Sequence, residues 1–75
     1  MQDYHYDEAS FAERLKELRT QKGLSQKQAS EQAGVPLSIL IKCESGNGCR
    51  GLENLVKFAA FYGVKVDFLL FGKKS

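Results

Sequence analysis

The chain has 75 residues, with 11 Lys and Arg against 9 Asp and Glu, and a formal net charge of +2 at pH 7. That length suits one domain with a small hydrophobic core. The sequence contains no apolar run of about 18 residues and begins with a polar, acidic stretch, so we expect neither a membrane span nor a signal peptide. Two cysteines are too few for a disulfide scaffold, which predicts reduced thiols and a cytoplasmic protein.

The positive charge lies in the body of the chain. Residues 1–9 contain three acidic residues and no Lys or Arg, so 11 basic residues stand against 6 acidic ones in the remainder, a net charge of +5. A basic domain of this kind is compatible with a DNA partner. Residues 1–8 lack apolar periodicity, which predicts a flexible N-terminal arm before a domain over 9–71.

The first helix is predicted over residues 10–21. Phe11, Leu15 and Leu18 recur at i, i+4 and i+7 and therefore form one buried stripe. Ser10 and Glu13 have the spacing of a capping box. The charged side chains of this region are expected to face solvent: Glu13, Arg14, Lys16, Glu17 and Lys22.

The second helix is predicted over residues 26–33. Ser25 followed three residues later by Gln28 is a capping box that begins it. Gly34 supplies the positive φ angle that ends it. The tight turn that follows leads directly into another helix.

The third helix is predicted over residues 36–45, with Pro36 in its first turn and Gly46 at its end. Leu40 and Cys43 are expected in the core. The opposite, outer side carries Leu37, Ser38, Ile41 and Lys42. Two short helices joined by a glycine turn predict a helix-turn-helix.

Two more helices are predicted, over 52–62 and 66–71, and a polar tail over 72–75 completes the chain. The inner stripe of the longer helix is expected to be Leu52, Leu55, Val56 and Ala59. Nothing alternates with period two over a useful length, so the fold class is all-α, with five helices. Four further aromatic side chains exceed what one small core can bury: Phe58, Phe61, Phe68 and Phe71.

These positions together resemble the Cro/phage-repressor (Xre-type) helix-turn-helix family over about 11–71. The matching residues are Phe11, Leu15, Leu18 and Arg19; Gly23, Leu24, Ser25 and Gln26; Ala29, Ala33, Gly34, Val35, Ser38, Leu40, Glu44 and Gly46; and Leu52, Glu53, Leu55, Ala59, Gly63, Val64, Asp67, Leu69 and Leu70. The resemblance implies a compact five-helix, lambda-repressor-like domain that binds double-stranded operator DNA, usually as a homodimer on a palindromic site. Repression of transcription is the expected outcome.

The resemblance also implies roles for individual residues. Gln26 matches a position that contacts a phosphate and braces the third helix, whose outer side chains would enter the major groove. Arg19 and Glu44 match a salt bridge between the first and third helices. The expected DNA-contacting residues are Gln26, Lys27, Pro36, Leu37, Ser38, Ile41, Lys42, Asn47 and Arg50.

The outer face of the third helix departs from the usual pattern, because Leu37 and Ile41 stand where polar side chains normally read bases. Two interpretations compete. The two residues could contact thymine methyl groups, which is a form of base readout. Alternatively, this face could bind a protein partner, as in an antitoxin-like or modulator module.

A symmetric dimer contact is expected from the surplus aromatics, namely Phe61, Phe68 and Phe71, because the family commonly dimerises through its fifth helix and nearby loops. No nucleophile–base pair, carboxylate dyad, phosphate loop or metal-ligand cluster is visible in the sequence. We therefore expect a protein that is not an enzyme and needs no cofactor or metal.

Overall fold

A computed structural model describes residues 8–46 and 51–72. These residues form five α-helices and no strand: α1 (Glu8–Gln21), α2 (Gln26–Ala33), α3 (Leu37–Ser45), α4 (Leu52–Tyr62) and α5 (Val66–Phe71). The predicted all-α, five-helix fold is confirmed. In this part of the chain, no helix is long and apolar enough to cross a membrane.

Two helix starts differ from prediction. Helix α1 begins at Glu8, inside the predicted arm, so Ser10 lies within the helix and does not cap it. Glu and Ala are good helix formers, so Glu8 and Ala9 extend the helix towards the N-terminus. Pro36 is the N-cap of α3 rather than its first residue, because its ψ of 140° is not helical. Its carbonyl oxygen accepts the first helical hydrogen bond, from Leu40 N at 3.0 Å.

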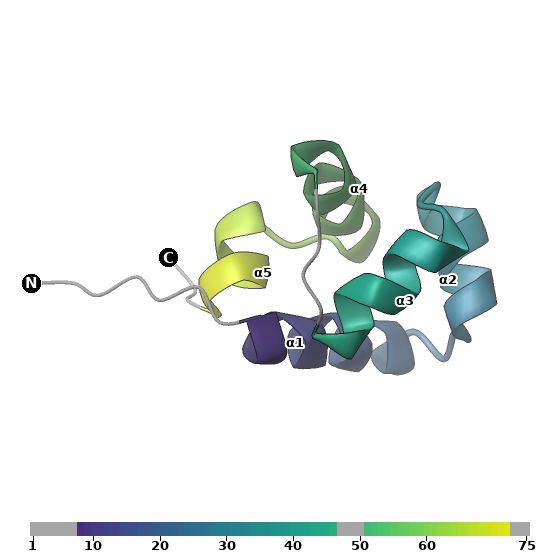
Figure 1. Cartoon of the computed structure of the whole chain (residues 1–75), viewed down its shortest axis with the longest axis horizontal. Helices are drawn as coiled ribbons and strands as arrows, with labels where there is room; N and C mark the ends of the chain where they lie inside the picture. The colour runs from purple at the N-terminus through teal and green to yellow at the C-terminus, as the bar shows by residue number, and fades with distance from the viewer. Residues whose placement is uncertain (1–7, 47–50, 73–75) are drawn as a thin grey trace, which may run out of the picture.

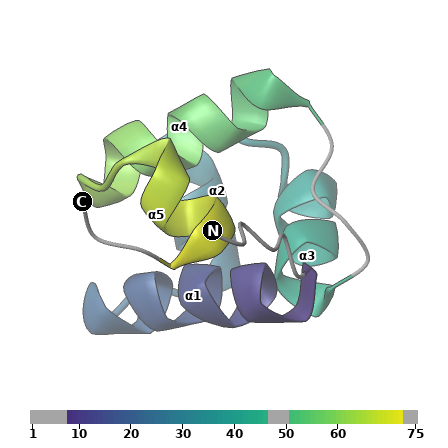
Figure 2. The same ribbon diagram turned by 90° about the vertical axis from the view of Figure 1, so that its left-hand side faces the viewer.

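The helices pack as two connected groups (Figures 1 and 2). Helix α5 lies between α1 and α4 and packs against both. Helices α2 and α3 pack against each other, and α1 also contacts α3. Helix α1 thus packs against both α5 and α3, and α4 packs against α2 as well as α5.

The core lies where these helices meet. Its largest fully buried side chains are Phe11, Phe58, Leu15, Leu40, Leu69, Val35 and Cys43. The predicted burial of Phe11, Leu15 and Leu40 is therefore confirmed. Each helix contributes at least one residue to the buried cluster, so none of the five is peripheral.

The predicted inner stripe of α4 is partly wrong. Leu52 and Val56 are 70% and 51% exposed, whereas Phe58, Ala59 and Tyr62 are buried. Two overlapping apolar stripes run along this helix, and only one can face the core. The stripe with Phe58 and Tyr62 buries more apolar area, so its burial is the more favourable choice.

Cys43 is buried as predicted, but the expectation of reduced thiols is contradicted, because Cys43 is disulfide-bonded. A low cysteine count argues against a disulfide scaffold but does not exclude a single disulfide. The chain's other cysteine, Cys49, lies outside the described residues.

Candidate nucleic-acid interface

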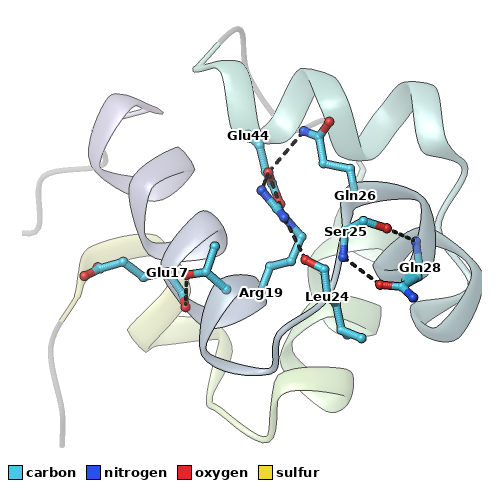
Figure 3. Close-up of polar contacts among 8 residues, drawn as sticks. Glu17, Arg19, Leu24, Ser25, Gln26, Gln28 and Glu44 are labelled. Carbon is cyan, nitrogen blue, oxygen red and sulfur yellow. Dashed lines mark hydrogen bonds and ion pairs between the residues drawn. The ribbon is translucent and has the colours of Figure 1, made fainter.

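The capping box at the start of α2 is formed as predicted (Figure 3). Gln28 N donates to Ser25 Oγ at 3.1 Å, and Ser25 N donates to Gln28 Oε1 at 2.9 Å. These two bonds satisfy donors that the first turn of a helix would otherwise leave unpaired. The start of α2, with Gln26 as its first residue, is therefore held in a defined orientation.

The turn between α2 and α3 is fixed by local and distant contacts. Gly34 has a φ of 75°, the left-handed conformation predicted for it. Ser30 Oγ donates to Val35 O at 2.6 Å, and the Val35 side chain is buried. Lys57 on α4 donates from Nζ to Gly34 O at 3.1 Å. The angle between α2 and α3 is thus set by contacts on both sides of the turn.

The ion pair expected between Arg19 and Glu44 is formed and lies at the back of α3 (Figure 3). Arg19 Nε donates to Glu44 Oε2 at 2.8 Å and Nη2 donates to Oε1 at 3.0 Å. Arg19 Nη1 also donates to Leu24 O at 2.8 Å. Glu44 is only 3% exposed, and its hydrogen bonds raise the pKa of Arg19 above its ordinary value. The guanidinium group thereby joins α1, the α1–α2 loop and α3.

Gln26 completes this network, because its Nε2 donates to Glu44 Oε1 at 3.2 Å. A primary amide carries two N–H donors, so one remains after this bond. Lys27, the next residue, is exposed. The structure therefore gives Gln26 the bracing contact that the family resemblance implies.

Tyr62 is a neighbour of this network that the sequence did not single out. Its hydroxyl is buried and, among the residues the structure describes, has no hydrogen-bond partner. Burial, and to a lesser degree the charge of Glu44, raise the pKa of Tyr62 to about 12. A neutral phenol therefore lies within the electrostatic influence of the Arg19–Glu44 pair.

The outer face of α3 carries the four side chains predicted for it. Leu37 and Ile41 are 39% and 44% exposed, and Ser38 and Lys42 are exposed as well. We call these four residues the α3 outer face. Pro36, just before the helix, is also exposed, whereas Asn47 and Arg50 lie outside the described residues.

The aromatics predicted at a dimer contact are each partly buried. Phe61 lies near the end of α4, and Phe68 and Phe71 belong to α5. Lys22 Nζ lies 5.3 Å from the centroid of the Phe61 ring, a cation–π contact. The Phe61 ring also packs against Tyr62, with centroids 4.9 Å apart.

Arg14 was expected to face solvent, but it is partly buried and binds α5. Its Nε donates to Leu69 O at 2.9 Å, and its Nη2 donates to Leu70 O at 2.8 Å. These carbonyls lie 55 and 56 residues away in the sequence. No local pattern around Arg14 could have indicated them.

A helix-turn-helix whose third helix is braced from behind and presents exposed side chains in front defines a class of DNA-binding domain. The chain belongs to the helix-turn-helix family, which it matches over residues 15–69. This membership supports the prediction that the domain is not an enzyme. It also agrees with the family resemblance found in the sequence.

Two curated relatives share about two-fifths of the aligned residues. The HTH-type transcriptional activator BcrR of Enterococcus faecalis is 41% identical over 64 residues, which cover 85% of this chain and 31% of BcrR. YonR, an uncharacterized prophage-derived HTH-type transcriptional regulator of Bacillus subtilis, is 40% identical over 62 residues, which cover 83% of this chain and 57% of YonR. The chain thus spans about a third of the length of BcrR and somewhat over half of the length of YonR.

Two solved structures share the fold. The restriction-modification controller protein C.AhdI from Aeromonas hydrophila superposes with a TM-score of 0.76 at 34% identity, covering 85% of this chain and 97% of that one. The hypothetical transcription factor NHTF from Neisseria superposes with a TM-score of 0.77 at 28% identity, covering 93% and 80%. Nearly all of C.AhdI is therefore matched by this one domain.

Proposed function

We propose that this domain is the DNA-binding part of a sequence-specific transcriptional regulator that reads its operator with the α3 outer face. The observation that carries the proposal is the pairing of four exposed side chains in front of α3 with a buried, bidentate ion pair behind it. A helix held in this way presents its side chains to the major groove without first having to be ordered.

Base readout by this face is partly apolar. Leu37 and Ile41 are exposed on successive turns and would contact thymine methyl groups. Lys42 and Ser38 add polar contacts to base edges or phosphates. The site would therefore prefer thymine at two positions in each half of the operator.

Phosphate contacts would come from the start of α2. Gln26 has an amide N–H left after its bond to Glu44, and Lys27 beside it is exposed. The N-terminus of a helix carries a partial positive charge, which favours a phosphate at this place. Pro36, exposed just before α3, would lie close to the DNA backbone.

The regulator is proposed to act as a homodimer through the partly buried aromatics Phe61, Phe68 and Phe71. A two-fold dimer would place two α3 helices on half-sites about 34 Å apart, so the operator would be palindromic. Repression is the proposed outcome, because a protein that covers an operator blocks the underlying DNA without needing further contacts.

A charge-matched pair of variants tests DNA binding. Lys42→Gln and Lys16→Gln each remove one positive charge from an exposed position, on α3 and α1 respectively. In fluorescence-anisotropy titrations, Lys42→Gln should weaken operator binding about tenfold and reduce the salt dependence by about one unit of slope. Lys16→Gln should stay within about twofold of the unmodified chain. Equal effects of the two substitutions would contradict the proposed docking of α3.

The exposed Leu37–Ile41 pair also supports a second candidate, a protein-interaction module. In that case the α3 outer face would bind an apolar groove of a protein partner. Ile41→Asp would then abolish capture of that partner in a pull-down, and the unmodified chain would shift no DNA at low salt. A salt-dependent DNA shift that Ile41→Asp abolishes would exclude this candidate in favour of DNA reading.

A further inference from the structure

Arg14 occupies a place in the fold that neither DNA contact nor core packing explains. It extends from α1 to the last turn of α5 and donates two hydrogen bonds, to Leu69 O at 2.9 Å and Leu70 O at 2.8 Å. The side chain is partly buried between the two helices. It thus makes a two-point contact between α1 and α5, which lie side by side in the fold although they come from opposite ends of the sequence (Figure 2).

The bonded carbonyls are ones that α5 cannot satisfy itself. The last four carbonyls of an α-helix lack intrahelical partners and carry the negative end of the helix dipole. Helix α5 has only six residues, which is too short to be stable in isolation. A guanidinium at this end supplies both hydrogen bonds and a favourable charge.

Gly72 shows how closely the guanidinium approaches the backbone. It caps α5 with a φ of 70°. A Cβ atom at this position would lie 2.8 Å from Arg14 Nη1 and 3.3 Å from Arg14 Cζ. Any side chain at position 72 would therefore displace the guanidinium. The position of the Arg14 guanidinium therefore depends on a glycine at position 72.

Helix α1 holds α5 and α3 through two arginines on the same helix. Arg14 binds the end of α5, and Arg19, five residues later, binds Glu44 near the end of α3. Helix α5 carries Phe68 and Phe71, which belong to the proposed dimer contact, and α3 carries the proposed reading face. The two arginines therefore lie between the part that would dimerise and the part that would read DNA.

We propose that Arg14 is a positioning residue that fixes α5 relative to α3 and so sets the spacing of the two half-sites. This inference rests on the proposed homodimeric function. Loss of the Arg14 contact would release the last turn of α5 while the core residue Leu69 keeps the helix attached. Each protomer would still recognise a half-site, but the two protomers would no longer be held at one separation.

The test uses Arg14→Gln, the conservative Arg14→Lys, and Lys16→Gln as a matched control that also removes one charge from α1. Sedimentation should give a dimer dissociation constant raised about tenfold for Arg14→Gln, equivalent to about 1.4 kcal/mol. Arg14→Lys keeps the charge but not the two-point geometry, so its effect should be intermediate. Lys16→Gln should stay within about twofold.

DNA duplexes then separate positioning from general stability. Affinity for a single half-site should stay within about twofold in every variant, while Arg14→Gln loses about tenfold on the full operator and discriminates less among half-site spacings. Hydrogen exchange should be faster in the last turn of α5 and unchanged in α2 and α3. This last readout remains interpretable for Arg14→Lys even if Arg14→Gln folds poorly.

The results that would contradict the proposed function differ from those that would contradict only the role of Arg14. An unmodified chain that stays monomeric or binds no DNA would overturn the proposed function, and the role of Arg14 with it. A dimeric, DNA-binding chain whose dimer constant and spacing preference are unaffected by Arg14→Gln would overturn only the role of Arg14. Equal losses on half-site and full operator would show that Arg14 merely stabilises the fold, which also overturns it.

Discussion

At the scale of single residues, the Arg19–Glu44 pair is the contact on which the presentation of α3 depends most. Glu44 is almost fully buried and accepts from Arg19 and Gln26, so its charge is compensated by three donor nitrogens. A buried charge that loses its partner is costly, because it retains neither water nor a counter-ion. The two residues should therefore be mutually dependent.

A double-mutant cycle tests this dependence. Arg19→Ala and Glu44→Ala should each lower the free energy of unfolding by about 3 kcal/mol, because each leaves a charge unpaired. In the background of Arg19→Ala, the second substitution should cost clearly less, since the carboxylate has already lost its partner. Urea denaturation followed by circular dichroism measures all four proteins. Additive losses would show that the two side chains act independently.

Tyr62 gives a prediction about pH. Its pKa of about 12 in the folded chain compares with about 10 for an unfolded tyrosine. The folded state therefore holds the phenolic proton more tightly than the unfolded state does. The resulting contribution to the free energy of unfolding is complete below pH 10 and is lost as the pH rises towards 12. Tyr62→Phe should flatten the alkaline loss of stability.

The same substitution should have little effect at neutral pH. The Tyr62 hydroxyl donates no hydrogen bond to the described part of the chain, so Phe should change the free energy of unfolding at pH 7 by no more than about 1 kcal/mol. Urea titrations of both proteins at pH 7, 10 and 11 make the comparison. A parallel decline in the two proteins would mean that other groups cause the alkaline loss.

At the scale of helices, the sequence predicts a helix end where a local signal marks it, and a buried face where a single apolar stripe is present. The Ser25–Gln28 box and the left-handed Gly34 are local signals, and both were predicted correctly. The buried face of α4 was predicted only in part, because two apolar stripes overlap on it and tertiary packing decides between them. The excess of aromatic residues, noted in the sequence, was the signal that could have favoured Phe58.

The two stripes of α4 should differ sharply in their sensitivity to substitution. Leu52→Ser removes a side chain that is mostly exposed, so stability should change by no more than about 0.5 kcal/mol. Phe58→Ala empties a fully buried position and should cost about 3–5 kcal/mol. Thermal and urea denaturation provide the two values. A large loss for Leu52→Ser would indicate that this face is covered in solution.

At the scale of the whole molecule, the five-helix fold and the α3 outer face could be predicted, because both follow from periodicity and family resemblance. The contacts of Arg14 and Lys57 could not, since their acceptors are backbone carbonyls distant in the sequence. Every residue type carries a backbone carbonyl, so the sequence does not indicate which carbonyl will accept such a bond. Arg14 joins α5 to α1, and Lys57 joins α4 to the turn between α2 and α3, so both side chains add contacts between the helices that the local sequence does not indicate.

The most direct test of the central claim is selection of binding sites from a random duplex library by the unmodified chain and by Leu37→Ala. The unmodified chain should enrich an inverted repeat with half-sites about 34 Å apart and thymines in each half. Leu37→Ala should enrich the same spacing with a relaxed preference at one thymine. An identical motif from both proteins, or no enriched motif from either, would contradict DNA reading by the outer face of α3.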